Sequence, residues 1–277
     1  MNIELDDKRW EEYVLNKHKE YFDLASSFLV CANNLQAECV RKRITREELG
    51  AKGYVLSFLF AKSYKTTKAA LLLCKSGYTE DALILARVNF EAALWALYII
   101  KDKENAEEKA QAFIKYDAID RKERLQKILN HYENNDEFKE KLREELGQVQ
   151  KELPVTEDEC KRVCKLAKKK VRELASESAI DSRLSQLLYG SFYWESSNYT
   201  HNSIRSSNSY VSDTEGHIHF LLVPAEKGLR NVLVHLCLFL WYVMDRFNFL
   251  FELGLEKTLT DKFAELSDFC KKTDPRN

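Results

Sequence analysis

The segment from Ala82 to Ile100 constrains the fold of this 277-residue chain more than any other. It is almost entirely apolar, yet Arg87 and Glu91 lie near its centre with Asn89 between them. A helix that is apolar all round is normally buried, and an unpaired charge in a protein interior is strongly destabilising. The sequence therefore predicts a buried helix whose two charges are paired with each other, with polar groups of other helices, or with a ligand.

The composition favours helices throughout. The chain has only 8 Gly and 3 Pro, which is typical of long helices rather than of a turn-rich β fold. We expect an all-α fold, with residues 1–277 forming a single helical domain built as a bundle of long helices. A charge-dense helical insertion is expected at 102–180, and at most one small β-hairpin near 205–223.

Local signals place several helix ends. A helical rhythm of aromatic and aliphatic residues extends over 7–42. Thr45, with Glu48 three residues later, predicts a capping box at the start of a helix over about 45–75. Thr79 is the predicted N-cap of the central apolar helix.

Within the charged insertion we expect two or three exposed helices. The breaks are predicted near Asn134–Asp136 and at Pro154, and Thr156 with Glu159 predicts a capped helix that continues to about Ser176. The last of these helices carries a basic run with five lysines and two arginines. This run is read as a solvated helix face, with contact to a phosphate backbone as the alternative.

Charge and cysteine usage indicate a cytoplasmic protein. The 43 basic and 44 acidic residues leave no global excess that would indicate binding to nucleic acid or a membrane surface. The seven cysteines are scattered and odd in number, as expected for reduced thiols. No signal peptide is visible at the N-terminus.

Two pairs of side chains have spacings that suit metal ligands. Cys160 and Cys164 would share a helix face, and His217 and His219 would share a strand face. Neither pair has matching ligands nearby, so we expect no metal site and no cofactor.

Two segments required a test against a membrane-spanning role. Ala82–Ile100 carries two charges at what would be mid-depth, and the apolar run 232–244 is shorter than the roughly 20 residues that span a bilayer. We expect both to be core helices, with no membrane contact. The second belongs to a long apolar helix from about Ala225 to Leu253, and a short amphipathic helix follows near 258–271.

Arg87 and Glu91 are four residues apart, so both project from one face of the central helix. One interpretation is an internal salt bridge that fixes helix register. The other is a polar pocket in which Arg87 holds an anionic ligand and Glu91 orients a neighbour.

The expected partner of this pair is the polar segment that contains Tyr193, Ser197, Asn198 and His201. If 191–200 is helical, Ser197 and His201 lie one turn apart on the face of Tyr193. His201 would then act as a general base or as a hydrogen-bond donor. A hydrolytic triad of Ser197, His201 and Glu91 can be written, but no strand–turn–helix elbow or glycine-flanked serine supports it.

Two stretches carry a resemblance to a known family. "ARVNFEAALWALYI" (86–99) and "LLYGSFYWESSNYTHNS" (187–203) resemble the helical family catalogued as domain of unknown function 5677. The resemblance extends over roughly 50–250, with 102–160 as a variable insertion, and implies a bacterial or archaeal helical bundle without a settled function. The positions that match the family pattern are Arg87, Glu91, Tyr189, Ser197, His201 and Ser203.

A second likeness is to HEPN domains, helical bundles that often dimerise and, when catalytic, cleave RNA without metal through an Arg-x4–6-His motif. The string "RNVLVH" (230–235) matches the motif, which makes Arg230 and His235 second-choice catalytic candidates. In a helix these two residues are separated by roughly 500° of rotation, so they flank one face rather than share it. At His201 the position five residues earlier is Ser196, and Arg87 would have to supply the cation.

The HEPN likeness implies an RNA-interacting protein, with a metal-independent ribonuclease toxin or phage-defence effector as the active form. His would take the 2′-hydroxyl proton and Arg would stabilise the phosphorane charge at a homodimer interface. The alternatives are a non-catalytic interaction module with a structural Arg/Glu/His cluster, and a sensor that binds an anionic ligand at Arg87. The sequence identifies no partner protein.

Overall fold

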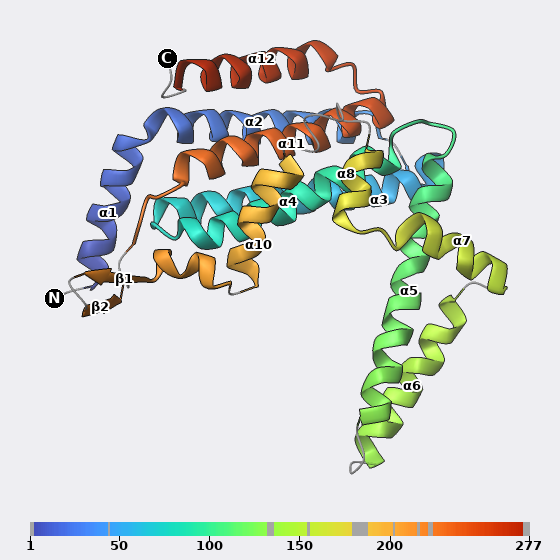
Figure 1. Ribbon diagram of the computed structural model, residues 1–277. Coiled ribbons are helices and arrows are strands. Elements are labelled where there is room, and N and C mark those ends of the chain that lie inside the picture. Colours follow the sequence, from blue (N-terminus) through green and yellow to red (C-terminus); the bar gives the residue numbers. More distant parts are fainter. Residues whose placement is uncertain are drawn as a thin grey trace.

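The computed structural model describes residues 3–43, 45–131, 136–153, 156–178, 188–201, 203–214, 217–220 and 224–273. The described elements are almost all helical, which confirms the all-α expectation (Figure 1). In chain order they are α1 (Ile3–Lys17), α2 (Lys19–Arg41), α3 (Arg46–Lys75), α4 (Thr79–Ile99), α5 (Ala106–His131), α6 (Asp136–Glu152), α7 (Glu157–Ala167), α8 (Val171–Glu177), the π-helix η1 (Leu188–Tyr193), α10 (Trp194–Thr200), the 3₁₀ helix η2 (Ile204–Ser209), β1 (Val211–Thr214), β2 (His217–Phe220), α11 (Leu229–Phe251) and α12 (Glu256–Thr273).

Helix α4 lies at the centre of the bundle, against α3 and α11, and α2 packs on α11 (Figure 1). Phe28 of α2, Phe90 of α4 and Phe239 of α11 are among the largest fully buried side chains. Burial on several sides explains why α4 is apolar nearly all round.

Two helices among the described residues, α4 and α11, are long and apolar enough to span a membrane. Most of the apolar window of each is buried inside the bundle, 67% in α4 and 56% in α11. Their composition is therefore accounted for by their place in the core.

The predicted capping box at the start of α3 is confirmed. The Oγ1 atom of Thr45 accepts the backbone N–H of Glu48 at 3.3 Å, and the Glu48 carboxylate accepts the backbone N–H of Thr45 at 2.8 Å. Two backbone N–H groups at the helix start, which have no partner within the helix, are hydrogen-bonded in this way. The predicted cap at Thr79 is wrong, because Thr79 is already the first residue of α4 and its hydroxyl donates to the carbonyl of Ala225 at 3.1 Å.

The helical character predicted for 7–42 is confirmed, but the segment is divided into two helices, because His18 separates α1 from α2. The imidazole of His18 is buried, and its Nε2 lies 2.8 Å from the carboxylate of Glu226, in the segment before α11. This tertiary contact lies at the point where the chain turns from α1 into α2 (Figure 1).

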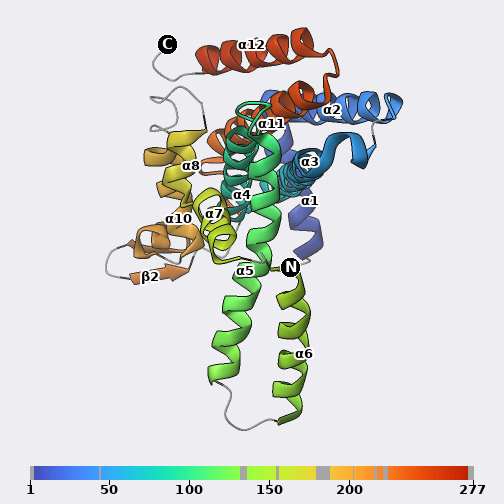
Figure 2. The ribbon, with the colours of Figure 1, turned by 90° about the vertical axis from the view of Figure 1, so that its right-hand side faces the viewer.

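Helices α5 and α6 form a hairpin that projects from the bundle, with α7 at its base; we call α5 and α6 the arm (Figures 1 and 2). The arm has a small core of its own, formed by Ala118, Leu125, Leu142 and Val149. The breaks predicted near Asn134 and at Pro154 lie outside the described residues.

The helix predicted from Thr156 to Ser176 begins as expected but ends early. Thr156 accepts the backbone N–H of Glu159 at 3.2 Å, and α7 then stops at Ala167. Lys170 is extended and its N–H donates to the carboxylate of Glu173, which starts α8 as a separate helix. The three residues 168–170 therefore form a non-helical link.

The predicted small hairpin is confirmed by β1 and β2, which pair antiparallel with Val211 opposite Phe220. Ile218 and Phe220 are largely exposed on one face of it. The side chains of His217 and His219, the candidate metal pair, are not among those described.

Candidate functional site

Arg87 and Glu91 are paired with each other and with the tyrosine-rich segment. The Nε atom of Arg87 lies 3.2 Å from Oε1 of Glu91, one turn away on α4. The Arg87 side chain is only 13% exposed, whereas that of Glu91 is 38% exposed. The Nη2 atom of Arg87 donates to the hydroxyl of Tyr193 at 2.9 Å, and the guanidinium lies 4.6 Å from the centre of that ring. The structure thus brings together three of the predicted site residues.

Aromatic packing holds η1 against α4 at this point. Phe90 contacts the rings of Phe192 and Tyr193, with centroids about 6 Å apart as is usual for aromatic pairs. Tyr189 stacks on Tyr193 at 5.2 Å. The phenol that meets Arg87 is therefore fixed in direction by its neighbours.

One nitrogen of the guanidinium, Nη1 of Arg87, is buried and has no hydrogen-bond partner within the described part of the chain. Asn89, between the two charges, donates to the hydroxyl of Thr67 at 2.7 Å. The buried helix α4 therefore makes polar contacts to α3, through Asn89, and to η1, through Arg87.

The other members of the predicted polar segment do not join this cluster. The hydroxyl of Ser197 donates to the backbone carbonyl of Tyr193 at 2.6 Å. His201 is exposed at the end of α10, and its described contact is a backbone bond to Ser197. The Asn198 carbonyl accepts the N–H of Ser203. The described residues therefore do not assemble a triad of Ser197, His201 and Glu91.

The second-choice pair, Arg230 and His235, also diverges. The Nε atom of Arg230 lies 3.4 Å from Nδ1 of His18, and its guanidinium is 5.5 Å from the ring centre of Tyr21. The imidazole of His235 stacks on Phe192 at 4.6 Å, on a different side of α11. The two side chains do not converge on one site, as the rotation between them predicted.

His235 lies in a small pocket of about 240 Å³. Its Nδ1 is 2.7 Å from the carbonyl oxygen of Asn231, so this nitrogen carries the proton and Nε2 has the free lone pair. Burial lowers the pKa of His235, which favours the neutral ring. Glu80, Glu195 and Lys227 also line the pocket.

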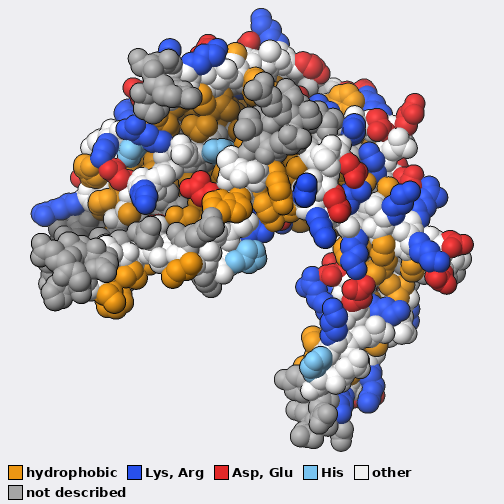
Figure 3. All heavy atoms as spheres, viewed as in Figure 1, with side chains coloured by type: hydrophobic (Ala, Val, Ile, Leu, Met, Phe, Trp, Pro, Cys, Tyr) orange, Lys and Arg blue, Asp and Glu red, His pale blue; other side chains and the backbone are white. Residues whose placement is uncertain are grey.

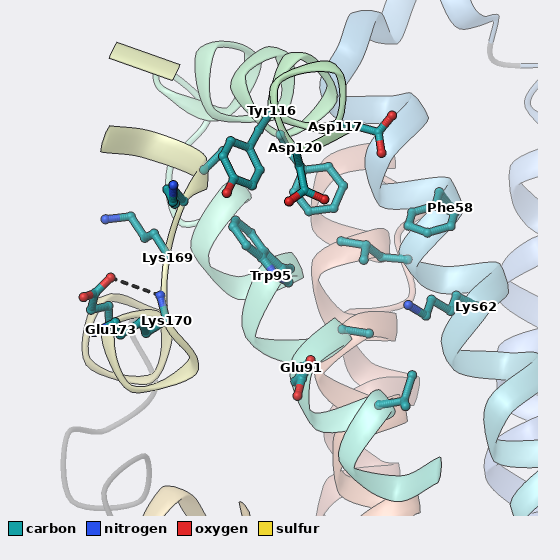
Figure 4. Close-up of a pocket in the computed structure, with 16 residues that line it drawn as sticks. Phe58, Lys62, Glu91, Trp95, Tyr116, Asp117, Asp120, Lys169, Lys170 and Glu173 are labelled. Carbon is teal, nitrogen blue, oxygen red and sulfur yellow. Dashed lines mark hydrogen bonds between the residues drawn. The ribbon is translucent and has the colours of Figure 1, made fainter. Parts of the chain in front are cut away.

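A cavity of about 750 Å³ lies between the bundle and the arm (Figure 4). It adjoins the Arg87 cluster, because Glu91 forms part of its wall. The lining residues come from α3, α4, α5, the 168–170 link and the ends of α7 and α8: Phe58, Leu59, Lys62, Val88, Glu91, Ala92, Trp95, Phe113, Tyr116, Asp117, Asp120, Ala167, Lys168, Lys169, Lys170 and Glu173. Figure 3 shows Lys and Arg side chains along the inner margin of the arm, where it meets the bundle.

Aromatic side chains form much of this wall. The indole of Trp95 packs edge-on against Phe113, with ring centres 4.9 Å apart. Phe58 is 47% exposed although it lines the cavity. Burial raises the pKa of the Tyr116 phenol, which keeps its hydroxyl as a hydrogen-bond donor.

The lysines of the cavity fall into two groups. Lys169 pairs with Glu177 at 2.9 Å, and Lys168 lies 3.7 Å from Glu123. Lys62 and Lys170 have no acidic side-chain partner among the described residues. Figure 4 shows Lys62 and Lys170 on opposite sides of the cavity, with Trp95 between them.

Three of the four acidic side chains of the cavity are paired with arginines, and the fourth, Glu173, accepts the backbone N–H of Lys170. Asp117 pairs with Arg121, and Asp120 pairs with Arg124. Glu91 is held by Arg87, as described above. Among the described residues, the ammonium groups of Lys62 and Lys170 are the ones in this wall without an acidic side-chain partner.

Sequence reasoning missed this cavity. Its residues are spread over more than one hundred positions, and each reads locally as a core aromatic or a solvated lysine. The one signal was the basic run from Lys161 to Arg172, whose central lysines line the cavity.

A family model described as "Family of unknown function (DUF5677)" matches residues 53–218. No curated protein and no solved structure matches the chain. The matched segment includes Arg87, Glu91, Tyr193 and all residues that line the cavity. Because the match extends over more than half of the sequence, the chain belongs to this family of unknown function.

Proposed function

We propose that this protein is a binding module that takes a nucleotide, free or within single-stranded RNA, in the cavity between the bundle and the arm. The observation that carries the proposal is the combination of aromatic walls with two ammonium groups, those of Lys62 and Lys170, that lack acidic partners within the described part of the chain. An aromatic base and a phosphate are the two parts of a nucleotide that such walls would recognise.

The size and the chemistry of the cavity support this ligand class. Cavities that bind small molecules usually measure about 300–1,000 Å³, and this one is about 750 Å³. Stacking of a base on an aromatic side chain is worth about 1–3 kcal/mol, and lysine is a common phosphate ligand. Of the four aromatic residues in the wall, Trp95 is the central one in Figure 4.

Binding is better supported than cleavage. A metal-independent ribonuclease needs a histidine and a cation that act on the same phosphodiester. In the described part of the chain His201 does not contact Arg87, and His235 and Arg230 face different neighbours. The ribonuclease, toxin and phage-defence roles implied by the HEPN likeness remain hypotheses, and the sensor alternative fits the geometry better.

The first experiment measures the melting temperature of the full chain with millimolar mononucleotides and, separately, with a short single-stranded RNA. A ligand that binds only the folded state raises the melting temperature. At a ligand concentration of one hundred times its Kd, the free energy of unfolding increases by about 2.7 kcal/mol. We expect a rise with mononucleotides; a rise with RNA alone would place the nucleotide within a strand. No rise with either would overturn the proposal.

Two variants test the site. Lys62→Ala with Lys170→Ala should abolish the rise, because both ammonium groups are removed. Lys65→Ala is the matched control, since Lys65 is exposed on α3 one turn after Lys62 and does not line the cavity. Equal loss in the control would contradict the assignment to the cavity. RNA incubated with the protein in EDTA should stay intact.

A further inference from the structure

Glu91 lies next to Trp95 in the cavity wall. It lies four residues before Trp95 on α4, and both side chains line the cavity (Figure 4). Residues at this spacing are neighbours on a helix surface, with Cβ atoms about 5–6 Å apart. A flat ring stacked on the indole of Trp95 would therefore bring its edge within reach of the Glu91 carboxylate.

The carboxylate of Glu91 is held in a fixed direction. Its Oε1 is bound by Arg87, whose guanidinium is mostly buried and is itself fixed by Tyr193. The other oxygen, Oε2, has no partner among the described residues, and the side chain is 38% exposed. The cluster thus presents free acceptor lone pairs to the cavity from a preorganised position.

The remaining acids of the cavity lack this arrangement. Asp117 is paired with an arginine on the arm and is 68% exposed. Asp120 is also paired on the arm. Glu173 already accepts the backbone N–H of Lys170. Glu91 is the acid of this wall whose cationic partner belongs to the bundle interior.

The edges of the four bases differ in what they offer to a carboxylate. Guanine presents two adjacent donors on its Watson–Crick edge, the ring N1–H and the exocyclic amino group, which match two carboxylate oxygens. Adenine and cytosine present an amino donor beside a ring acceptor, and uracil presents one N–H between two carbonyls. In these three bases an acceptor would face the carboxylate, which is unfavourable.

We infer that Glu91 selects the base and that the ligand of the cavity is a guanine nucleotide. The inference rests on the proposed nucleotide binding. The base stacks on Trp95 with its donor edge on Glu91, and the phosphate pairs with Lys62 or Lys170. Arg87 and Tyr193 act through Glu91 as positioning residues.

The test is isothermal titration calorimetry of the full chain with the 5′-monophosphates of guanosine, inosine, adenosine, cytidine and uridine. We expect guanosine monophosphate to bind at least about tenfold more tightly than the adenosine, cytidine and uridine nucleotides. Inosine monophosphate, which lacks the amino group, should be intermediate. This comparison uses the unmodified protein and does not depend on the folding of a variant.

Glu91→Gln, which replaces one acceptor by a donor, should remove the preference for guanine, whereas Glu140→Gln, on α6 and outside the cavity, should retain it. Equal affinity for all five nucleotides would overturn the inference about Glu91 and leave nucleotide binding intact. Binding of none of them would overturn the proposed function itself. Guanine preference that persists unchanged in Glu91→Gln would assign selection to another residue.

Discussion

The guanidinium of Arg87 donates to the hydroxyl of Tyr193 at 2.9 Å, across 106 positions of sequence. This bond ties η1 to the central helix of the bundle. It also fixes the arginine that orients Glu91 in the cavity wall. Stability and ligand selection are therefore linked through one partly buried contact.

Arg87→Ala should lower the free energy of unfolding by about 2 kcal/mol. The loss of a fully buried partner costs about 3–5 kcal/mol, and an exposed pair contributes about 0–1 kcal/mol. The 38% exposure of Glu91 places this pair between the two cases. Urea unfolding monitored by circular dichroism measures the change.

Tyr193→Phe is the companion variant, because it removes one hydroxyl and keeps the ring over Arg87. Its expected cost is about 1 kcal/mol, the usual net value of one hydrogen bond. An unchanged unfolding midpoint in both variants would show that the contact is not formed in solution.

The neutral state of His235 predicts a pH dependence of stability. Burial lowers the pKa of His235 in the folded state, so the unfolded chain binds its proton more readily. The stability contributed by the neutral ring is complete above about pH 6.5, the pKa of histidine in the unfolded chain. It is lost as the pH falls from there toward the lower pKa of His235 in the folded protein. The melting temperature should therefore fall as the pH is lowered from 8 to 5, and the fall should begin near about pH 6.5.

His235→Gln should flatten the fall, whereas His201→Gln should leave it unchanged because His201 is exposed. A histidine titration followed by NMR gives a direct check. A His235 resonance that titrates above the ordinary histidine range would contradict the burial of this ring.

Glu226 predicts a second, more acidic transition. Its hydrogen bonds to Lys17 and then to His18 hold the pKa of this carboxyl below its ordinary value. The stability that Glu226 contributes is therefore present above about pH 4.3, the pKa of glutamate in the unfolded chain. It is lost as the pH falls through the lower pKa of Glu226 in the folded protein. Glu226→Gln should reduce the loss of stability below about pH 4.3. Acid unfolding curves that coincide for the two proteins would argue against this contact at the α1–α2 junction.

Local sequence patterns predicted much of the fold. The capping box of Thr45 and Glu48 and the small hairpin depend on neighbouring residues, and both are present. The contact between Arg87 and the tyrosine-rich segment followed from the energetic cost of a buried charge. His18 could not be recognised as a break, because its partner Glu226 lies 208 positions away.

The cavity depends still more on tertiary structure. Its wall brings Phe58, Trp95, Tyr116 and Lys170 together from three helices and the 168–170 link. Apart from the basic run that contains Lys170, no local pattern distinguishes these residues from core or surface residues. Only the placement of the arm against the bundle creates the site. His201 is exposed, although its sequence neighbourhood favoured a role near Arg87.

The most direct measurement is to locate a bound nucleotide by photo-crosslinking with 8-azidoguanosine and 8-azidoadenosine monophosphates, followed by peptide mapping. We expect crosslinks on peptides that contain Trp95, Phe113 or Tyr116, suppressed by excess unmodified nucleotide and absent after Lys62→Ala with Lys170→Ala. Crosslinks confined to the pocket of His235, or labelling that excess nucleotide does not suppress, would contradict binding in the cavity.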